Sequence, residues 1–157
     1  FGHHDDTVYG IGWEFDEGGS DVQKVCGDYP AVISFDLGEI ELGGDKSLDK
    51  VPFEKIRKEI INQYNRGGLV SLSWHPRNPK TGGDAWDVSD HAVVKSILPE
   101  GENYEKFQSW LGKVNDFILS LKTSDGTNSV LGTNTPEVGS GGDRIYVPRM
   151  NTRRYGE

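Results

Sequence analysis

Two short apolar segments, each followed by a longer amphipathic segment, constrain the fold of this chain most strongly. Ala31–Leu37 (AVISFDL) and Leu69–His75 (LVSLSWH) are mostly apolar and bounded by Gly or Pro, which is typical of strands buried on both faces. Pro52–Arg66 and Tyr104–Lys122 carry apolar residues at helical spacing, and Gly67-Gly68 follows the first of them. The order strand, helix, strand, helix predicts βαβ units and a parallel sheet.

Two further elements are predicted from weaker patterns. Val8–Trp13 (VYGIGW) is a third candidate strand, although its glycines also suit a loop. Ser20–Val25 predicts a short helix with Ser20 as its N-cap, because a serine hydroxyl can accept from a backbone N–H of the first turn. The 157 residues are enough for one ordinary domain, but a complete (β/α)8 barrel typically needs about 250.

Polar and aromatic residues follow both predicted strands at the point where each strand ends. Ligands of parallel sheets bind at the carboxyl ends of the strands, so Asp36, His75 and the loop after His75 are expected on one face. Trp86, in a Gly-rich polar loop, is a candidate for stacking on the apolar face of a sugar ring. Trp74 is assigned to the core. Asp36 and Glu39 are not assigned as a catalytic pair, because the sequence does not distinguish them from hydrogen-bonded structural acids.

The charge of the chain bounds its partners. The net charge of −8 argues against a nucleic-acid partner, because phosphate binding needs clustered Lys and Arg side chains. It suits a neutral ligand such as a polysaccharide. No apolar run approaches the roughly 20 residues of a membrane span, and no stretch has the pattern of a signal peptide.

A run of potential metal ligands leaves a metal-dependent hydrolase as an alternative. His3, His4, Asp5 and Asp6 are consecutive, but adjacent residues rarely all face one ion, and no second cluster has ligand spacing. The preferred interpretation is a polar loop without a metal. Cys26 is the sole cysteine, so no intrachain disulfide can form, and we expect it to be a small buried hydrophobe.

Three segments carry a family resemblance. They are GHHDDTVYGIGW (Gly2–Trp13), GDYPAVISFDLGEIELG (Gly27–Gly43) and GGLVSLSWHPRNPKTGGDAWD (Gly67–Asp87). Together they resemble the opening half of the β-mannanases of glycoside hydrolase family 26, over residues 1–128. The resemblance implies an α/β fold, the parallel (β/α)8 TIM barrel, present here as a partial barrel. It also implies hydrolysis of internal β-1,4-mannosidic bonds with retention, without a cofactor or a metal.

The resemblance further implies which residues bind the substrate. His75 matches a histidine that lines the glycone subsite next to the cleavage point, and Asn78, Trp86 and the Gly2-His3 element match the cleft-lining pattern. The expected partner is mannan or a mannooligosaccharide, and the expected location is secreted, cell-surface or periplasmic. A hydrolase of another β-linked glycan and a non-catalytic carbohydrate-binding protein are the alternatives. The two long predicted helices oppose the latter, which an all-β pattern would favour.

The residues after Asn128 depart from the family. In the members of the family, the third helix leads into a fourth strand with a motif of the type FRPWHEHTGSWFWWG. The Glu of this motif is the general acid/base, and the nucleophilic Glu lies much further along the chain. This sequence shows neither, so no catalytic residue is assigned and the fragment is expected to be inactive. Nucleotides encoding that motif can be chosen so that, read one base later, they encode Ser129–Gly142 (SVLGTNTPEVGSGG) in order. Residues 129–157 are therefore interpreted as an out-of-frame tail.

Overall fold

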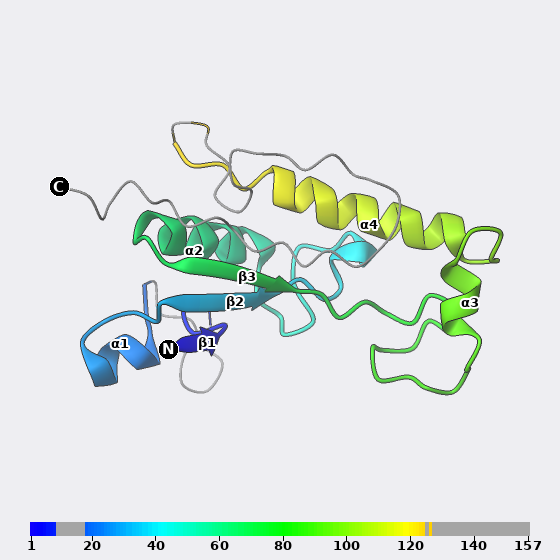
Figure 1. The fold of residues 1–157 in the computed structure, drawn as a ribbon, viewed down its shortest axis with the longest axis horizontal. Helices are drawn as coiled ribbons and strands as arrows, with labels where there is room; N and C mark the ends of the chain where they lie inside the picture. Colours follow the sequence, from blue (N-terminus) through cyan, green and yellow to red (C-terminus); the bar gives the residue numbers. More distant parts are fainter. Residues whose placement is uncertain (9–17, 125, 127–157) are drawn as a thin grey trace.

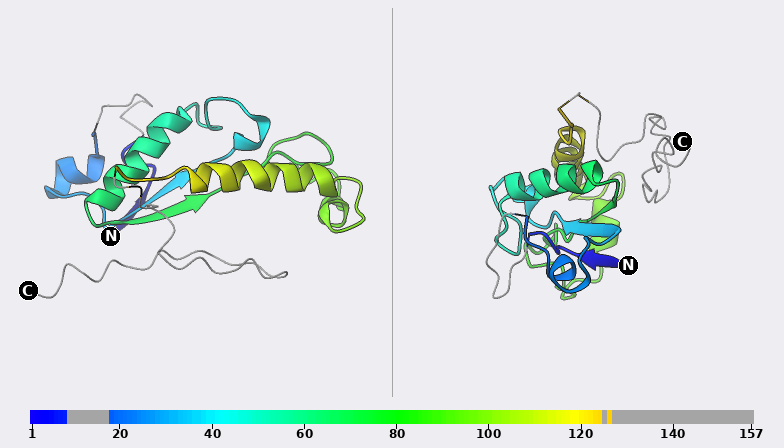
Figure 2. Two further views of the ribbon diagram at one scale, coloured as in Figure 1. Left: turned by 90° about the horizontal axis from the view of Figure 1, so that it is seen from above. Right: turned by 90° about the vertical axis from the view of Figure 1, so that its left-hand side faces the viewer.

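Strands and helices alternate along the chain. The computed structural model describes residues 1–8, 18–124 and 126. The strands lie together and the two long helices lie on one side of them (Figures 1 and 2). In chain order the elements are β1 (Gly2–His4), α1 (Asp21–Cys26), β2 (Val32–Asp36), the 3-10 helix η2 (Ile40–Leu42), α2 (Phe53–Asn65), β3 (Leu69–Ser73), α3 (Val93–Ile97) and α4 (Tyr104–Leu119).

The three strands form one parallel sheet in the order β1-β2-β3. Val32 pairs with Leu69 and Asp36 pairs with Ser73, so β2 and β3 run side by side over their full lengths. On the other edge of β2, Gly2 pairs with Val32. The predicted parallel pairing of the two apolar segments is confirmed. Because all three strands run the same way, their carboxyl ends meet at one edge of the sheet.

The apolar core lies between the sheet and α2. Ile33 and Phe35 of β2 are fully buried, and they belong to one cluster with Ile56 and Ile60 of α2. α4 extends this cluster through Phe117. Burying side chains of this size stabilises the fold by about 1.5–3 kcal/mol each. The helices therefore anchor the middle of the sheet and fix where its strands end.

The other row of side chains on β2 and β3 is polar from Ser34 and Ser71 onward. Ser34 pairs with Ser71, and Asp36 pairs with Ser73. Ser71 is exposed and Ser34 is half-buried, while His4 Nδ1 lies 2.5 Å from Ser34 Oγ. The prediction that both strands are buried on both faces is therefore wrong at Ser71 of β3, whereas β2 has no exposed residue. The physical reason is that the long helices cover one face alone, so only alternate side chains enter the core.

The first strand starts earlier than predicted. β1 spans Gly2–His4, and Asp5 continues its ladder by donating its backbone N–H to Ser34 O at 2.8 Å. Val8 is buried in the turn that follows, so the predicted strand is wrong at this residue, and residues 9–13 lie outside the described part of the chain. A Cβ on Gly2 would lie 3.3 Å from Val32 Cβ, so the glycine lets the two strands approach closely.

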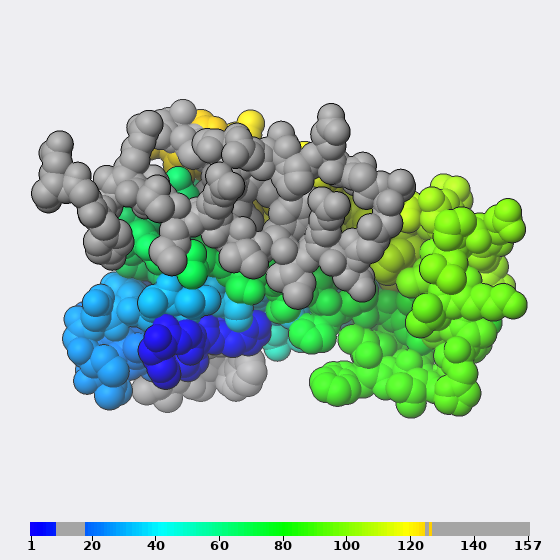
Figure 3. Space-filling view, viewed as in Figure 1, coloured from blue at the N-terminus to red at the C-terminus, as the bar shows by residue number. Residues whose placement is uncertain are grey.

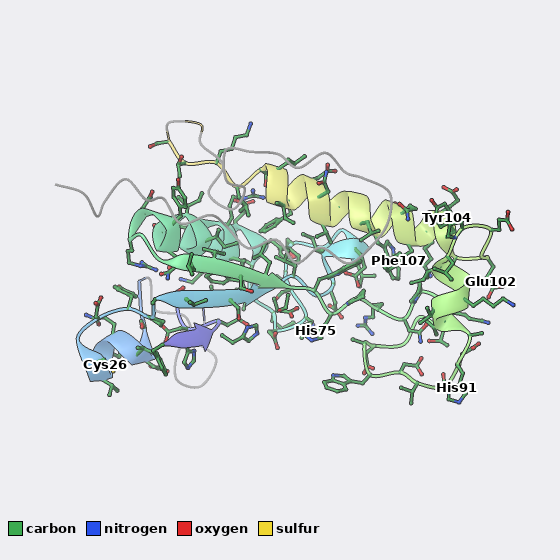
Figure 4. All side chains as sticks on the ribbon, in the orientation of Figure 1. Cys26, His75, His91, Glu102, Tyr104 and Phe107 are labelled. Atoms are coloured by element: carbon green, nitrogen blue, oxygen red, sulfur yellow. The ribbon has the colours of Figure 1, made fainter. Side chains whose placement is uncertain are left out.

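The predicted helices are confirmed with shorter bounds, since α2 ends at Asn65 and α4 at Leu119. The N-cap of α1 is also confirmed, because Ser20 Oγ accepts from the backbone N–H of Gln23 at 3.0 Å. Cys26 is exposed at the end of α1, which corrects the expectation of burial (Figure 4). The reason is that α1 contains no buried residue and so covers no core. The short helix α3 was not predicted.

Candidate functional site

A cleft lies at the edge of the sheet where the parallel strands end. Its volume is about 350 Å³. The segment after β3, together with α3, forms a green lobe at the right-hand end of the molecule (Figure 3). The strand ends contribute His4, Asp36 and His75 to the cleft, and the loops after β2 and β3 contribute mainly charged and aromatic groups, among them Glu39, Asp49, Arg77, Asp84 and Trp86.

Asp36 and His75 form the central pair of the cleft. Asp36 is 3% exposed, and its Oδ1 accepts from the backbone N–H of Gly38 at 2.6 Å. Its Oδ2 accepts from Ser73 Oγ at 2.7 Å and pairs with His75 Nδ1. A carboxylate fixed by other donors holds one ring nitrogen of the imidazole and so orients the ring. The other nitrogen, Nε2, is then the one available to a ligand, and the His75 side chain is 53% exposed.

An ion pair joins the loop after β2 to the loop after β3 across the cleft. The Arg77 guanidinium pairs with Glu39 Oε1. Glu39 has a backbone φ of 70°, in the left-handed region that residues with a Cβ rarely adopt. Such backbone persists when surrounding contacts hold it, and it is enriched at functional sites. The ion pair with Arg77 is one such contact, so it ties the shape of the loop after β2 to the loop after β3.

Trp86 is presented on a loop built from hydrogen bonds. The Trp86 side chain lines the cleft and the residue is 84% exposed. Asp84 Oδ1 accepts from the backbone N–H of Trp86 at 2.9 Å, which fixes the turn that carries the indole. Hydrogen bonds from Ser89 and Thr81 lower the pKa of the nearby Asp87 carboxyl below its usual value. The loop is therefore held by its own polar groups while its aromatic ring meets solvent.

Asn78 is a buried residue of this loop. It is 6% exposed, and its Oδ1 accepts from the backbone N–H groups of Lys80 and Thr81 at 3.0 and 3.1 Å. Its Nδ2 donates to the backbone carbonyl of Asp87 at 3.1 Å. The Asn78 side chain thus makes these hydrogen bonds within the loop. Among the described residues, it is not part of the lining of the cleft.

Comparison of the amino-acid sequence with known proteins identifies the family of this chain. The profile of the family described as Glycosyl hydrolase family 26 matches residues 6–128. The chain belongs to glycosyl hydrolase family 26. It is also 34% identical, over 111 residues, to a mannan endo-1,4-β-mannosidase of Bifidobacterium adolescentis. That alignment covers 68% of this chain and 11% of the relative.

Solved family 26 structures share the fold. A β-mannanase of Bacteroides ovatus is 64% identical, with a TM-score of 0.79 over 81% of this chain and 37% of that chain. An endo-β-1,4-mannanase of Cellulomonas fimi is 25% identical, with a TM-score of 0.70 over 83% of this chain and 30% of that chain. These relatives are (β/α)8 barrels, and the parallel sheet described above is part of such a barrel.

This family 26 chain spans only part of its relatives' length. It matches about a tenth of the curated relative and about a third of each of these two solved structures. None of the helices in the described part of the chain has the length and apolar character needed to cross a bilayer.

The cleft brings together some of the residues that the sequence suggested and not others. His75 and Trp86 both line it, whereas His3 does not and its neighbour His4 does. Successive side chains of a strand point to opposite faces, so a shift by one residue decides which histidine enters the cleft. Within the described residues, no group of three or more His, Cys, Asp or Glu side chains is arranged to hold a metal ion.

Sequence reasoning missed His4, Asp49, Arg77 and Asp84 as lining residues. The register of β1 on β2 is the signal that would have selected His4, because His4 pairs with Ser34 in the row that leads to Asp36. Arg77 and Asp84 lie in the loop after β3, and Asp49 lies in the loop after β2. Loops of this kind have no periodicity from which the direction of a side chain follows.

Proposed function

We propose that this family 26 chain forms part of the substrate cleft of an endo-β-1,4-mannanase, which hydrolyses internal β-1,4-mannosidic bonds of mannan. The names of the relatives from Bifidobacterium adolescentis, Bacteroides ovatus and Cellulomonas fimi support this substrate. The observation that carries the proposal is His75, held by Asp36 in a cleft that also contains the exposed Trp86. A sugar ring offers an apolar face to an indole and hydroxyl groups to an imidazole.

The proposed reaction is a retaining double displacement by two Glu residues. One carboxylate attacks the anomeric carbon while the other, as an acid, protonates the leaving glycosidic oxygen. The second carboxylate then deprotonates a water molecule, which breaks the mannosyl–enzyme ester and regenerates the first carboxylate. In this scheme His75 and Trp86 bind and orient the glycan and form no covalent bond with it. We assign neither catalytic Glu to this chain, because its sequence lacks the family motif that would contain the general acid/base.

The proposal divides the chain into two parts. Residues 1–128 are the family 26 part, and residues 129–157 are an out-of-frame tail. The chain as it stands should therefore lack hydrolytic activity, because binding residues cannot replace absent carboxylates. We also infer that the parent enzyme acts outside the cytoplasm, where a polymer such as mannan is accessible. Its partner is mannan or a mannooligosaccharide, with no role for nucleic acid at a net charge of −8.

The test is a histidine substitution in an enzyme whose family reading frame is restored after Asn128. His75→Ala should lower kcat/KM on a mannooligosaccharide by about 10- to 100-fold, the loss of a hydrogen bond worth about 1.5–3 kcal/mol. His91→Ala is the matched control, because His91 is exposed in the loop before α3 and outside the cleft (Figure 4). Equal kcat/KM for His75→Ala, His91→Ala and the parent would remove His75 from the substrate site.

A further inference from the structure

Glu41 is a buried acidic residue bonded to the segment that carries His75 into the cleft. It lies in η2 and is 1% exposed. Its Oε2 accepts from the indole Nε1–H of Trp74 at 2.9 Å, and its Oε1 accepts from the backbone N–H of Arg77 at 2.7 Å. The two donors stand on either side of His75 in the sequence. One carboxylate thus accepts hydrogen bonds from residues just before and just after the histidine of the cleft.

The surroundings of Glu41 make this arrangement rigid. The Trp74 ring stacks on Phe107 of α4, with ring centroids 5.8 Å apart. Lys113, also of α4, donates its Nζ to the backbone carbonyl of Glu41 at 2.5 Å. Removing a carboxylate from water is costly unless its oxygens are hydrogen-bonded, and both oxygens of Glu41 are. Glu41 therefore connects η2, the end of β3 and α4 through buried hydrogen bonds, whose loss would leave a buried charge without partners.

The position of these bonds suggests a role in the site rather than in the core alone. Pro76 follows His75 and has no N–H to donate, so the backbone N–H of Arg77 is the next amide donor after His75. We propose that Glu41 is a positioning residue, which fixes the Trp74–Arg77 segment so that His75 meets Asp36 and Arg77 meets Glu39. The link from this positioning to glycan binding rests on the proposed function.

A glutamine at this position tests the proposal with little change of shape. The side chain of Glu41→Gln offers one oxygen acceptor and one NH₂ group, so it can satisfy only one of the two donors. Bonds to a charged group contribute about 1.5–3 kcal/mol, so the amide of Arg77 or the indole of Trp74 should exchange hydrogen about tenfold faster or more. Nitrogen NMR of the 157-residue chain measures both exchange rates, and it also reports the imidazole signals of His75, which should shift.

Two further variants make the result specific. Glu59→Gln is the matched control, because Glu59 of α2 is also fully buried but bonds Asn62 Nδ2 at 3.2 Å, within its own helix. It should leave the signals of His75 and Arg77 unchanged. Trp74→Phe removes one donor, so in Glu41→Gln/Trp74→Phe the single oxygen of Gln can serve Arg77 alone. The Arg77 amide should then return towards the parent exchange rate.

The outcomes separate this proposal from the proposed function. Unchanged His75 signals and unchanged exchange at both donors in a folded Glu41→Gln chain would overturn the positioning role. If Glu41→Gln does not fold, Trp74→Phe alone decides, and an unshifted His75 signal in that variant overturns it equally. Activity of the enzyme with the restored reading frame on mannohexaose is a separate arm: an enzyme that folds but does not hydrolyse it contradicts the proposed function and leaves the unliganded result intact. An equal kcat/KM on mannohexaose for that enzyme and its folded Glu41→Gln variant breaks the link between the two.

Discussion

The sheet with its covering helices and the loop after β3 are stabilised in different ways. In the first region, Ile33, Phe35 and Ile60 are fully buried and packed in one apolar cluster. In the second, Trp86 is 84% exposed and Val88 is 77% exposed. In this loop, side-chain oxygens accept hydrogen bonds from backbone N–H groups two residues further along the chain. The accepting side chains are those of Asn78, Asp84, Asp87 and Asp90. Apolar packing thus sets where the cleft is, and local hydrogen bonds set its shape.

The largest expected effect lies in the apolar region. Phe35→Ala should lower the free energy of unfolding by about 3–5 kcal/mol, because it removes a fully buried ring and leaves a cavity. Phe1→Ala is the control, since Phe1 is 82% exposed and its loss should change that free energy by no more than about 0.5 kcal/mol. Urea denaturation measures both values. Equal effects at the two positions would break the assignment of the core to the space between β2 and α2.

A glycine at the start of β3 sharpens the comparison within the same region. A Cβ on Gly68 would lie 1.9 Å from Gln63 Nε2 and 3.2 Å from the backbone carbonyl of Ala31. Gln63 is buried and donates to Pro30 O at 2.9 Å, so it has little freedom to move. Gly68→Ala should therefore destabilise the chain by about 1–3 kcal/mol.

Gly112 is a glycine at which alanine should have the opposite effect on stability. It lies in α4, and a Cβ there would meet nothing within 4 Å. Gly112→Ala should stabilise the chain by about 0.5–1 kcal/mol, because Ala loses less backbone entropy than Gly in a helix. Thermal and urea denaturation of the two variants should therefore shift in opposite directions. Stabilisation of the chain by Gly68→Ala as well would show that the close packing of α2 on β3 is wrong.

The hydrogen-bonded loop should respond locally. Asn78→Ala leaves the backbone N–H groups of Lys80 and Thr81 without their side-chain acceptor. We expect the free energy of local opening of this loop to fall by about 1–3 kcal/mol, with little change in the free energy of opening of β2. Hydrogen exchange resolves the two regions, and Asn115→Ala, at an exposed position of α4, is the control. Equal loss of protection in the loop and in β2 would mean that the loop is not a separate unit of stability.

The smallest expected effect is a response of the loop to acid. Hydrogen bonds from Ser89 and Thr81 lower the pKa of Asp87 in the folded chain. A lowered folded pKa gives stability that is present above the ordinary carboxyl pKa of 3.8 and is lost as the pH falls through the folded value. The amide signal of Ser89 should therefore shift below pH 3.8, with no matching transition in Asp87→Asn. A transition that persists in that variant would assign the effect to another group.

The sequence predicted the apolar region much better than the loop. Short apolar runs located β2 and β3, and apolar residues at helical spacing located α2 and α4, because burial selects apolar side chains in these patterns. The parallel order then predicted that Asp36 and His75 would lie at the same edge of the sheet, and the structure confirms this and adds a direct contact between them. β1 was missed since it has three residues, and its pairing with β2 depends on contacts 30 positions away in the chain.

The loops and the exposed elements could not be predicted in the same way. The bonds of Glu41 to Trp74 and Arg77 join residues more than thirty positions apart through side chains, and no local pattern encodes them. Cys26 was expected inside because free cysteines are usually buried, but α1 rests on no core. Such features follow from the path of the chain in three dimensions.

The most direct test of the account compares mannan hydrolysis by two matched proteins. One is the chain of 157 residues, and the other continues after Asn128 in the family frame, with the FRPWHEHTG-type motif and its natural downstream sequence. Release of reducing ends from β-1,4-mannan measures the activity of each. The account predicts hydrolysis by the restored enzyme and none by the 157-residue chain. Hydrolysis by the shorter chain, under conditions that exclude a contaminating enzyme, or a folded restored enzyme that leaves mannan intact, would contradict it.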